Sequence, residues 1–70
     1  MPHIRVKMFP GRTEEIKQSL ADALKKTMIE ELQCPEGVVS VSIVDVEKDK
    51  WDAEVMDKIQ AEEMFIKPNK

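Results

Sequence analysis

The amino-terminal stretch reads MPHIRVKMFPGR, residues 1–12, and it combines a short strand with an unusual terminus. From His3 to Met8, apolar and polar residues alternate, and a period of two indicates a strand with one buried face. Phe9-Pro10-Gly11 should end this strand, because proline cannot donate to a ladder and Pro-Gly favours a turn. If Met1 is removed, Pro2 presents a secondary amine, and α-amino groups titrate far below lysine. The stretch therefore predicts a strand that holds an ionisable amine in a fixed place.

The residues after this stretch predict a helix and a second strand. Thr13 is a good N-cap, and two glutamates follow it where the helix dipole favours negative charge. Apolar residues then recur at helical spacing as far as Leu32, and Pro35 should end the helix near Gln33. The segment Val38 to Val46 alternates apolar residues with serine, which predicts a strand with one apolar face. Strand, helix and strand form a βαβ unit, whose strands run parallel.

The carboxy-terminal third carries the remaining apolar residues. Trp51, Val55 and Ile59 recur near helical spacing, which predicts a short helix or series of turns. Phe65-Ile66-Lys67-Pro68 is an apolar tail that we expect to dock on the body or on a neighbouring subunit. The predicted fold class is α+β: one βαβ unit with parallel strands and a short C-terminal helix and tail, in a single domain spanning residues 1–70.

The size and composition of the chain predict an oligomer. Seventy residues bury too little surface for high stability, and such chains usually need disulfides, metals or partner subunits. One cysteine and one histidine allow neither an intrachain disulfide nor a metal cluster. Two strands do not form an independently stable sheet, so we expect oligomerisation to extend it. The lone cysteine and the lack of a membrane span or signal-peptide core predict a cytoplasmic protein with no membrane partner.

The charge distribution favours a small anionic ligand. The net charge of −3 argues against nucleic acid as the main partner. All fourteen acidic residues lie at Glu14 or later, whereas Arg5, Lys7 and Arg12 fall in an opening segment without any. A basic patch on an acidic protein suits a small anion. The alternative is that three cations fall in this segment by chance.

Pro2 and Arg12 are the leading candidates for chemistry. A free prolyl amine can act as a general acid and base, and neighbouring cations and partial burial would both lower its pKa toward neutral pH. Arg12 follows a glycine at the end of the strand, and guanidinium binds carboxylate in a two-pronged way. The alternatives are a Met-Pro start without consequence and a solvated arginine at the helix entry. Trp51 is either a pocket wall or a packing residue, and His3, as a lone strand histidine, is more often structural.

With these residues in place, the chain resembles the 4-oxalocrotonate tautomerase family. The shared features, in chain order, are Met1-Pro2 leading a strand, Pro10-Gly11-Arg12 before the helix, Val39-Ser40-Val41-Ser42-Ile43 as the second strand, and Trp51 after it. The segments Asp49-Lys50-Trp51 and Phe65-Ile66-Lys67-Pro68 resemble the branch called PptA-type tautomerases. The resemblance covers essentially the whole chain and implies a tautomerase, or MIF-like, fold.

The resemblance also implies an activity and roles for particular residues. The activity is keto–enol tautomerisation of a small 2-oxo acid or dienol, such as 2-hydroxymuconate or phenylenolpyruvate, without metal or cofactor. Pro2 would be the general acid and base, Arg12 would bind the substrate carboxylate, and Trp51 would help to wall the pocket. The best-studied members carry a second arginine where this chain has Ser40, which can donate a hydrogen bond but brings no charge. Family members form dimers or hexamers built from dimers, and the PptA-like tail favours the dimer.

Two other functions stay open at this point. Related families use the same proline for hydration, dehalogenation or decarboxylation of small acids. Because the second arginine is missing here, such an activity is a second hypothesis for this chain. The third reading is a non-catalytic oligomeric binding module. Retention of Met1 would favour it, because Pro2 nitrogen is then an amide without a lone pair for proton transfer.

Overall fold

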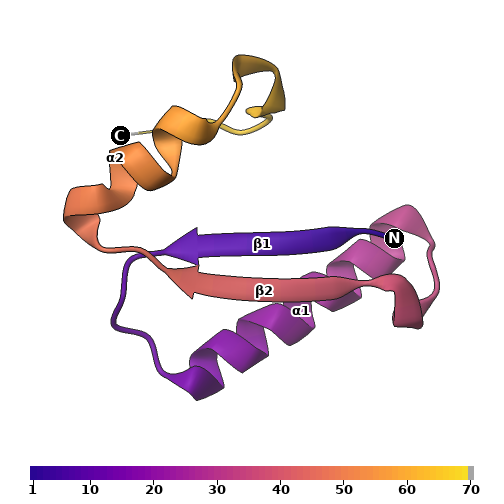
Figure 1. The fold of residues 1–70 in the computed structure, drawn as a ribbon. Helices are drawn as coiled ribbons and strands as arrows, with labels where there is room; N and C mark the ends of the chain where they lie inside the picture. Colours follow the sequence, from indigo (N-terminus) through magenta and orange to yellow (C-terminus); the bar gives the residue numbers. More distant parts are fainter. Residues whose placement is uncertain (70) are drawn as a thin grey trace.

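The computed structural model describes residues 1–69 and has the predicted βαβ core. Its helices and strands are β1 (His3–Met8), α1 (Glu14–Leu32), β2 (Ser40–Asp45) and α2 (Trp51–Glu54). The two strands lie side by side and parallel, with His3 opposite Ser40 and Met8 opposite Asp45. Helix α1 connects them (Figure 1). The predicted fold class is confirmed, including the short C-terminal helix.

Helix α1 begins and ends where the sequence predicts. The Thr13 side chain accepts a hydrogen bond from the backbone N–H of Ile16 at 3.2 Å, so it caps the first turn. At the other end, Gln33 adopts a left-handed conformation with φ of 52°, which turns the chain out of the helix before Pro35. The helix therefore stops within a residue of the predicted boundary.

Strand β2 begins two residues later than the predicted start at Val38. Residues Glu36–Val38 form a 3-10 turn instead. In this turn the backbone N–H of Val38 donates to the Pro35 carbonyl at 3.3 Å, and that of Val39 donates to the Glu36 carbonyl at 3.4 Å. Because these two N–H groups are used locally, they are not available to the strand ladder.

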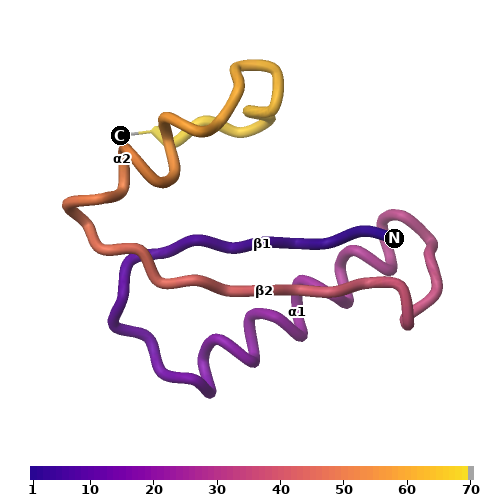
Figure 2. Tube along the Cα trace, in the orientation of Figure 1, coloured from indigo at the N-terminus to yellow at the C-terminus, as the bar shows by residue number. Residues whose placement is uncertain are grey.

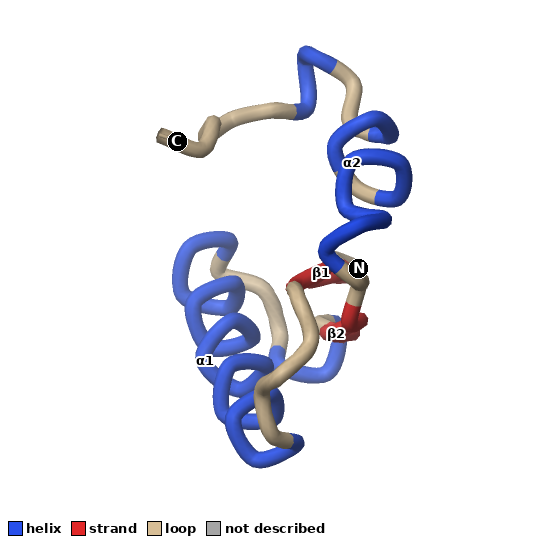
Figure 3. Tube along the Cα trace, turned by 90° about the vertical axis from the view of Figure 1, so that its left-hand side faces the viewer, coloured by secondary structure: helices blue, strands red, loops and turns tan. Residues whose placement is uncertain are grey.

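The sheet has different neighbours on its two faces. Ile4, Val41 and Ile43 line hollows shared with α1, so their face of the sheet is the one that the helix covers. In the C-terminal segment, residues 51–69, helix α2 lies beyond the β1 edge of the sheet, on the side away from α1, and the tail after it crosses back above β1 toward the α1 side (Figure 3). The Lys7 side chain, on the opposite face to Ile4, donates a hydrogen bond from Nζ to the Glu54 carbonyl at 2.9 Å and so ties this segment to β1.

Taken alone, the chain is open. Its accessible surface is 5962 Å², whereas a folded monomer of this mass typically exposes about 4,500 Å². Its radius of gyration is 13.6 Å, against about 11 Å for a compact domain of the same length. Within residues 1–69, only Val39 and Val46 are buried. A single copy therefore lacks a full core.

Apolar side chains at the ends of the helix and in the tail remain in solvent. Ile16 and Leu32 on α1 are 53% and 58% exposed. Phe65 and Ile66 are 93% and 86% exposed. The predicted tail thus does not dock these two side chains on its own chain, which leaves a neighbouring subunit as their expected partner.

Candidate functional site

Pro2 lies at the start of β1, beside the first residue of β2. The Ser40 backbone N–H donates to the Pro2 carbonyl at 3.2 Å. The next residue, His3, places its ring against β2: Nδ1 lies 2.6 Å from Ser40 Oγ, and Nε2 lies 3.0 Å from Ser42 Oγ. Two of the predicted site residues, Pro2 and Ser40, are therefore neighbours. With Met1 still attached, Pro2 nitrogen is an amide.

Arg12 and Trp51 lie at the other end of β1. Gly11 has a φ of +126°, a conformation that side chains rarely adopt, and it turns the chain from β1 toward α1 just before Arg12. The Phe9 ring meets Trp51 edge to face, with ring centroids 4.9 Å apart and an interplanar angle of 79°. The turn after β1 and the connection from β2 to α2 run together at this end (Figure 2). Arg12 is exposed there.

The structure does not bring the four predicted site residues together in one chain. Pro2 precedes β1 and Ser40 lies opposite its first residue, whereas Arg12 follows β1 and Trp51 packs on Phe9. Strand β1 has six residues, and a strand rises about 3.3 Å per residue, so β1 puts roughly 20 Å between Pro2 and Arg12. A small acid cannot contact Pro2 and Arg12 of the same copy at once.

A cleft of about 530 Å³ lies between β1 and the C-terminal segment. Three cationic side chains line it, those of Arg5, Lys7 and Lys58, together with the Glu63 carboxylate. The remaining lining is apolar and consists of Trp51, Val55, Ile59 and Met64. Three cations against one carboxylate make the cleft positive, which suits an anion. Sequence reasoning included Arg5, Lys7 and Trp51 but missed Lys58, because nothing in the chain distinguishes it from other solvated lysines.

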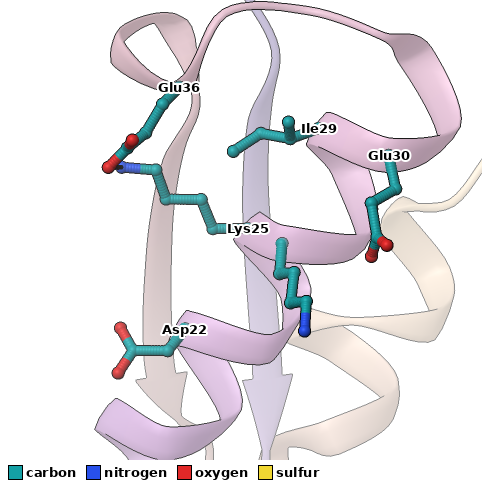
Figure 4. Close-up of a pocket in the computed structure, with 6 residues that line it drawn as sticks. Asp22, Lys25, Ile29, Glu30 and Glu36 are labelled. Atoms are coloured by element: carbon teal, nitrogen blue, oxygen red, sulfur yellow. Dashed lines mark ion pairs between the residues drawn. The ribbon is translucent and has the colours of Figure 1, made fainter.

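A smaller hollow of about 330 Å³ lies between α1 and the turn before β2 (Figure 4). Lys25 and Glu36 form an ion pair across it at 3.9 Å. Asp22, Lys26, Ile29 and Glu30 complete the lining. None of the candidate site residues reaches this hollow, so we assign it no part in the chemistry.

One ion pair joins α1 to the end of β2. Lys17 Nζ lies 2.9 Å from Asp45 Oδ2, and the hydrogen bond from Lys17 to Asp45 raises the pKa of the lysine above its ordinary value of 10.5. This pair lies on the α1 side of the sheet, and its role is structural.

Metal and membrane sites find no support in the described part of the chain. No group of three or more His, Cys, Asp or Glu side chains within residues 1–69 is placed to hold a metal ion. Cys34 is a half-buried free thiol. No helix in the same range is long and apolar enough to cross a membrane.

Comparison with known proteins identifies the family. Residues 2–58 match the tautomerase enzyme family, and the chain belongs to it. It is 41% identical over 58 residues to tautomerase PptA of Cronobacter sakazakii, covering 81% of this chain and 76% of that one. It is 44% identical over 55 residues to a probable tautomerase of Xylella fastidiosa, covering 79% and 67% of the two chains.

A solved structure agrees with these relatives. The apo crystal structure of an unfused 4-oxalocrotonate tautomerase superposes with a TM-score of 0.67 at 35% identity, over 70% of this chain and 80% of that one. The resemblance inferred from the sequence is therefore confirmed. Membership of this family supports a tautomerase, and hence isomerase, function.

Proposed function

We propose that this protein is a cofactor-independent tautomerase that interconverts the enol and keto forms of a small 2-oxo acid. Pro2, freed by removal of Met1, acts as the general acid and base. The main support is that the family match begins at residue 2 and that Pro2 leads β1 directly beside Ser40. Phenylenolpyruvate and 2-hydroxymuconate are the substrates of the proposed class that we would test first.

The reaction needs one proton shuttle and no external reactant. The neutral amine of Pro2 takes the proton from the enol hydroxyl, and the electron pair left on oxygen forms the carbonyl. The carbon–carbon double bond then takes up the same proton from the prolyl ammonium at carbon. Atoms and charge balance, and the amine returns to its neutral form. Such positioned acid–base catalysis contributes roughly 100- to 10,000-fold in rate.

We propose further that Arg12 and Trp51 serve the Pro2 of a second copy. Arg12 would bind the substrate carboxylate through its guanidinium, and Trp51 would exclude water from the pocket. The separation of about 20 Å that β1 puts between Pro2 and Arg12 supports this assignment, because in a two-fold dimer with β1 strands in opposite directions Pro2 of one copy can meet Arg12 of the other. The incomplete core and the exposed Phe65 and Ile66 also favour a homo-oligomer.

A dimer is favoured over a hexamer built from dimers. The support is that Trp51, Val55 and Ile59 line a cleft with Arg5 and Lys7 on the face away from α1, so in this proposal they occupy part of the face on which a further sheet would stack. In this proposal residues 1–70 act as one tautomerase domain in the cytoplasm. Analytical ultracentrifugation would distinguish two copies from six.

The proposal is tested with protein purified without a tag. Intact mass first establishes that Met1 is absent. Ultraviolet absorbance then follows the conversion of phenylenolpyruvate and 2-hydroxymuconate by wild type, by Pro2→Ala and by Pro68→Ala, a control proline in the exposed tail. We expect a large loss only for Pro2→Ala. Equal rates for wild type and Pro2→Ala would exclude the proline mechanism.

The uncharged Ser40 supports a second candidate within the same fold. Without a second guanidinium, the site could serve hydration, dehalogenation or decarboxylation of small acids through the same proline. A panel of halogenated and 2-oxo acids separates the two, since these reactions release halide or carbon dioxide or consume water. Met1 still attached in native cells, together with no turnover of any acid, would favour a binding module instead.

A further inference from the structure

The side chains of His3, Ser40 and Ser42 form one hydrogen-bonded cluster, which we call the imidazole–serine cluster. Residues alternate between the faces of a strand, so His3 shares a face with Arg5, which lines the cleft away from α1. Ser40 is the direct cross-strand partner of His3, and Ser42 is the partner of Arg5. The cluster therefore occupies the face away from α1, at the Pro2 end of the sheet.

The ring nitrogens limit how the protons of the cluster can be arranged. A neutral imidazole has one N–H donor and one acceptor nitrogen. Since Nδ1 faces Ser40 Oγ and Nε2 faces Ser42 Oγ, one serine must accept from the ring while the other donates to it. With a neutral ring, two arrangements satisfy both contacts.

The two arrangements differ in what Ser40 can offer a ligand. In the first, Ser42 O–H donates to Nε2, Nδ1–H donates to Ser40 Oγ, and the Ser40 hydroxyl proton is free to point away from the ring. In the second, Ser40 spends its proton on Nδ1 and offers only lone pairs. An oxygen that gains negative charge selects the first arrangement, because it needs a donor. Hydrogen bonds in such a chain polarise one another and strengthen the last donor.

We propose that the imidazole–serine cluster binds the 2-oxo oxygen of the substrate, with the Ser40 hydroxyl as the donor. His3 is a positioning residue that orients this hydroxyl, and Ser42 holds His3 in the Nδ1–H tautomer. The inference rests on the proposed tautomerase function. It assigns the hydrogen-bond donor that stabilises negative charge on the substrate oxygen in that same site. The geometric support is that the Ser40 N–H donates to the Pro2 carbonyl at 3.2 Å, so the two residues are cross-strand neighbours and an oxygen held by Ser40 would lie in the vicinity of the working amine.

The proposal predicts a graded series of variants. Ser40→Ala removes the donor and should lower kcat by roughly 10- to 1,000-fold with a smaller change in KM, as for an oxyanion-stabilising group. His3→Leu should lower kcat less. His3→Asn should recover much of the loss, because its amide keeps a donor near the Nδ1 position. Ser42→Ala acts only through His3, so it should lower kcat in wild type and change little in the His3→Leu background.

The experiment measures kcat and KM on phenylenolpyruvate for these variants, with intact mass and thermal melting for each. Ser19→Ala, an exposed serine on α1, is the matched control, and Ser40→Thr keeps the hydroxyl if Ser40→Ala fails to fold. Two outcomes would overturn the cluster proposal while leaving the proposed function intact, provided that wild type is active and Pro2→Ala is inactive. The first is full kcat in Ser40→Ala, and the second is equal kcat in His3→Asn and His3→Leu. An inactive wild type of verified mass overturns the proposed function and the cluster with it.

Discussion

The two ends of β1 differ in nearly every respect. At the Pro2 end, the polar side chains of His3, Ser40 and Ser42 hydrogen-bond to one another across the sheet. At the Arg12 end, a left-handed glycine, an exposed guanidinium and the Phe9–Trp51 aromatic pair form a loop surface. One end suits proton transfer and hydrogen bonding to an oxygen, and the other suits binding of a carboxylate against an apolar wall. Neither end of one chain offers both proton transfer and carboxylate binding. For this reason we propose that the active site forms between two copies.

The largest effect is expected from blocking the amine at the Pro2 end. A chain that carries one extra glycine between Met1 and Pro2 keeps Pro2 as an amide, so activity should fall by roughly 100- to 10,000-fold. The fold should be unaffected, because residue 1 is fully exposed and lies outside β1. Circular dichroism and the absorbance assay measure the two properties. Full activity in the extended chain would contradict the proline mechanism.

The next largest effect is expected from removing the guanidinium at the Arg12 end, alone and in combination with a change at the Pro2 end. Arg12→Ala should raise KM roughly tenfold or more, since it removes a charge-assisted carboxylate contact. If Arg12 serves the Pro2 of another copy, refolding Pro2→Ala and Arg12→Ala together should restore about a quarter of wild-type activity, measured at a substrate concentration well below KM. In random mixing, half of the dimers combine the two variants, and each of these has one intact site of two. No recovery on co-refolding would mean that both residues act within one chain.

A smaller change is expected from placing a cation at the Pro2 end. Ser40→Arg should lower KM for the dicarboxylate 2-hydroxymuconate several-fold, up to about tenfold, relative to phenylenolpyruvate. The physical reason is that a second guanidinium can pair with a second carboxylate. Ser19→Arg on α1 adds the same charge away from the site and should leave the ratio of the two KM values unchanged. If the ratio of the two KM values is the same in Ser40→Arg and Ser19→Arg, position 40 does not contact the substrate.

The aromatic pair at the Arg12 end should contribute modestly to stability. In a double-mutant cycle of Phe9→Leu and Trp51→Leu, the coupling free energy should be about 0.5–1.5 kcal/mol, the usual range for edge-to-face rings. Urea unfolding at fixed protein concentration measures it. Additive effects of the two substitutions would show that the contact adds nothing beyond ordinary apolar burial.

The smallest effect concerns pH and belongs to the α1 face of the sheet, where Asp45 lies opposite Met8 at the Arg12 end. The hydrogen bond to Asp45 raises the pKa of Lys17 in the folded protein above 10.5. Its stabilising contribution is therefore complete below pH 10.5 and is lost as the pH rises through the raised pKa. Thermal melts should show that the Tm of wild type falls more between pH 10 and pH 12 than that of Lys17→Met. Lys26→Met is the control, and an identical slope in wild type and Lys17→Met would contradict the assignment.

Much of the fold was predictable because its signals are local. The alternation from His3 to Met8 predicted β1 with its correct limits, and Thr13 predicted the start of α1. The error at the start of β2 has a physical cause. Val38 continues the apolar pattern of the strand, but the turn after Pro35 uses the backbone N–H groups of Val38 and Val39. Side-chain patterns do not report how backbone donors are shared.

The members of the candidate site stay a prediction, and their arrangement could not be predicted from the sequence. Pro2, Arg12 and Trp51 were chosen by residue type and order along the chain, and these say nothing of the roughly 20 Å that β1 puts between Pro2 and Arg12. The cleft beside β1 was missed as a whole, because Lys58 joins it only through the path of the C-terminal segment.

The sequence by itself determined the βαβ unit, the presence of an N-terminal proline and the missing charge at Ser40, because each depends on residue type and short-range periodicity. Only the tertiary structure decided that His3 contacts both serines, since these partners lie 37 and 39 residues away and meet through the register of two parallel strands. It likewise decided that Pro2 and Arg12 stand at opposite ends of β1, because a strand is rigid and extended.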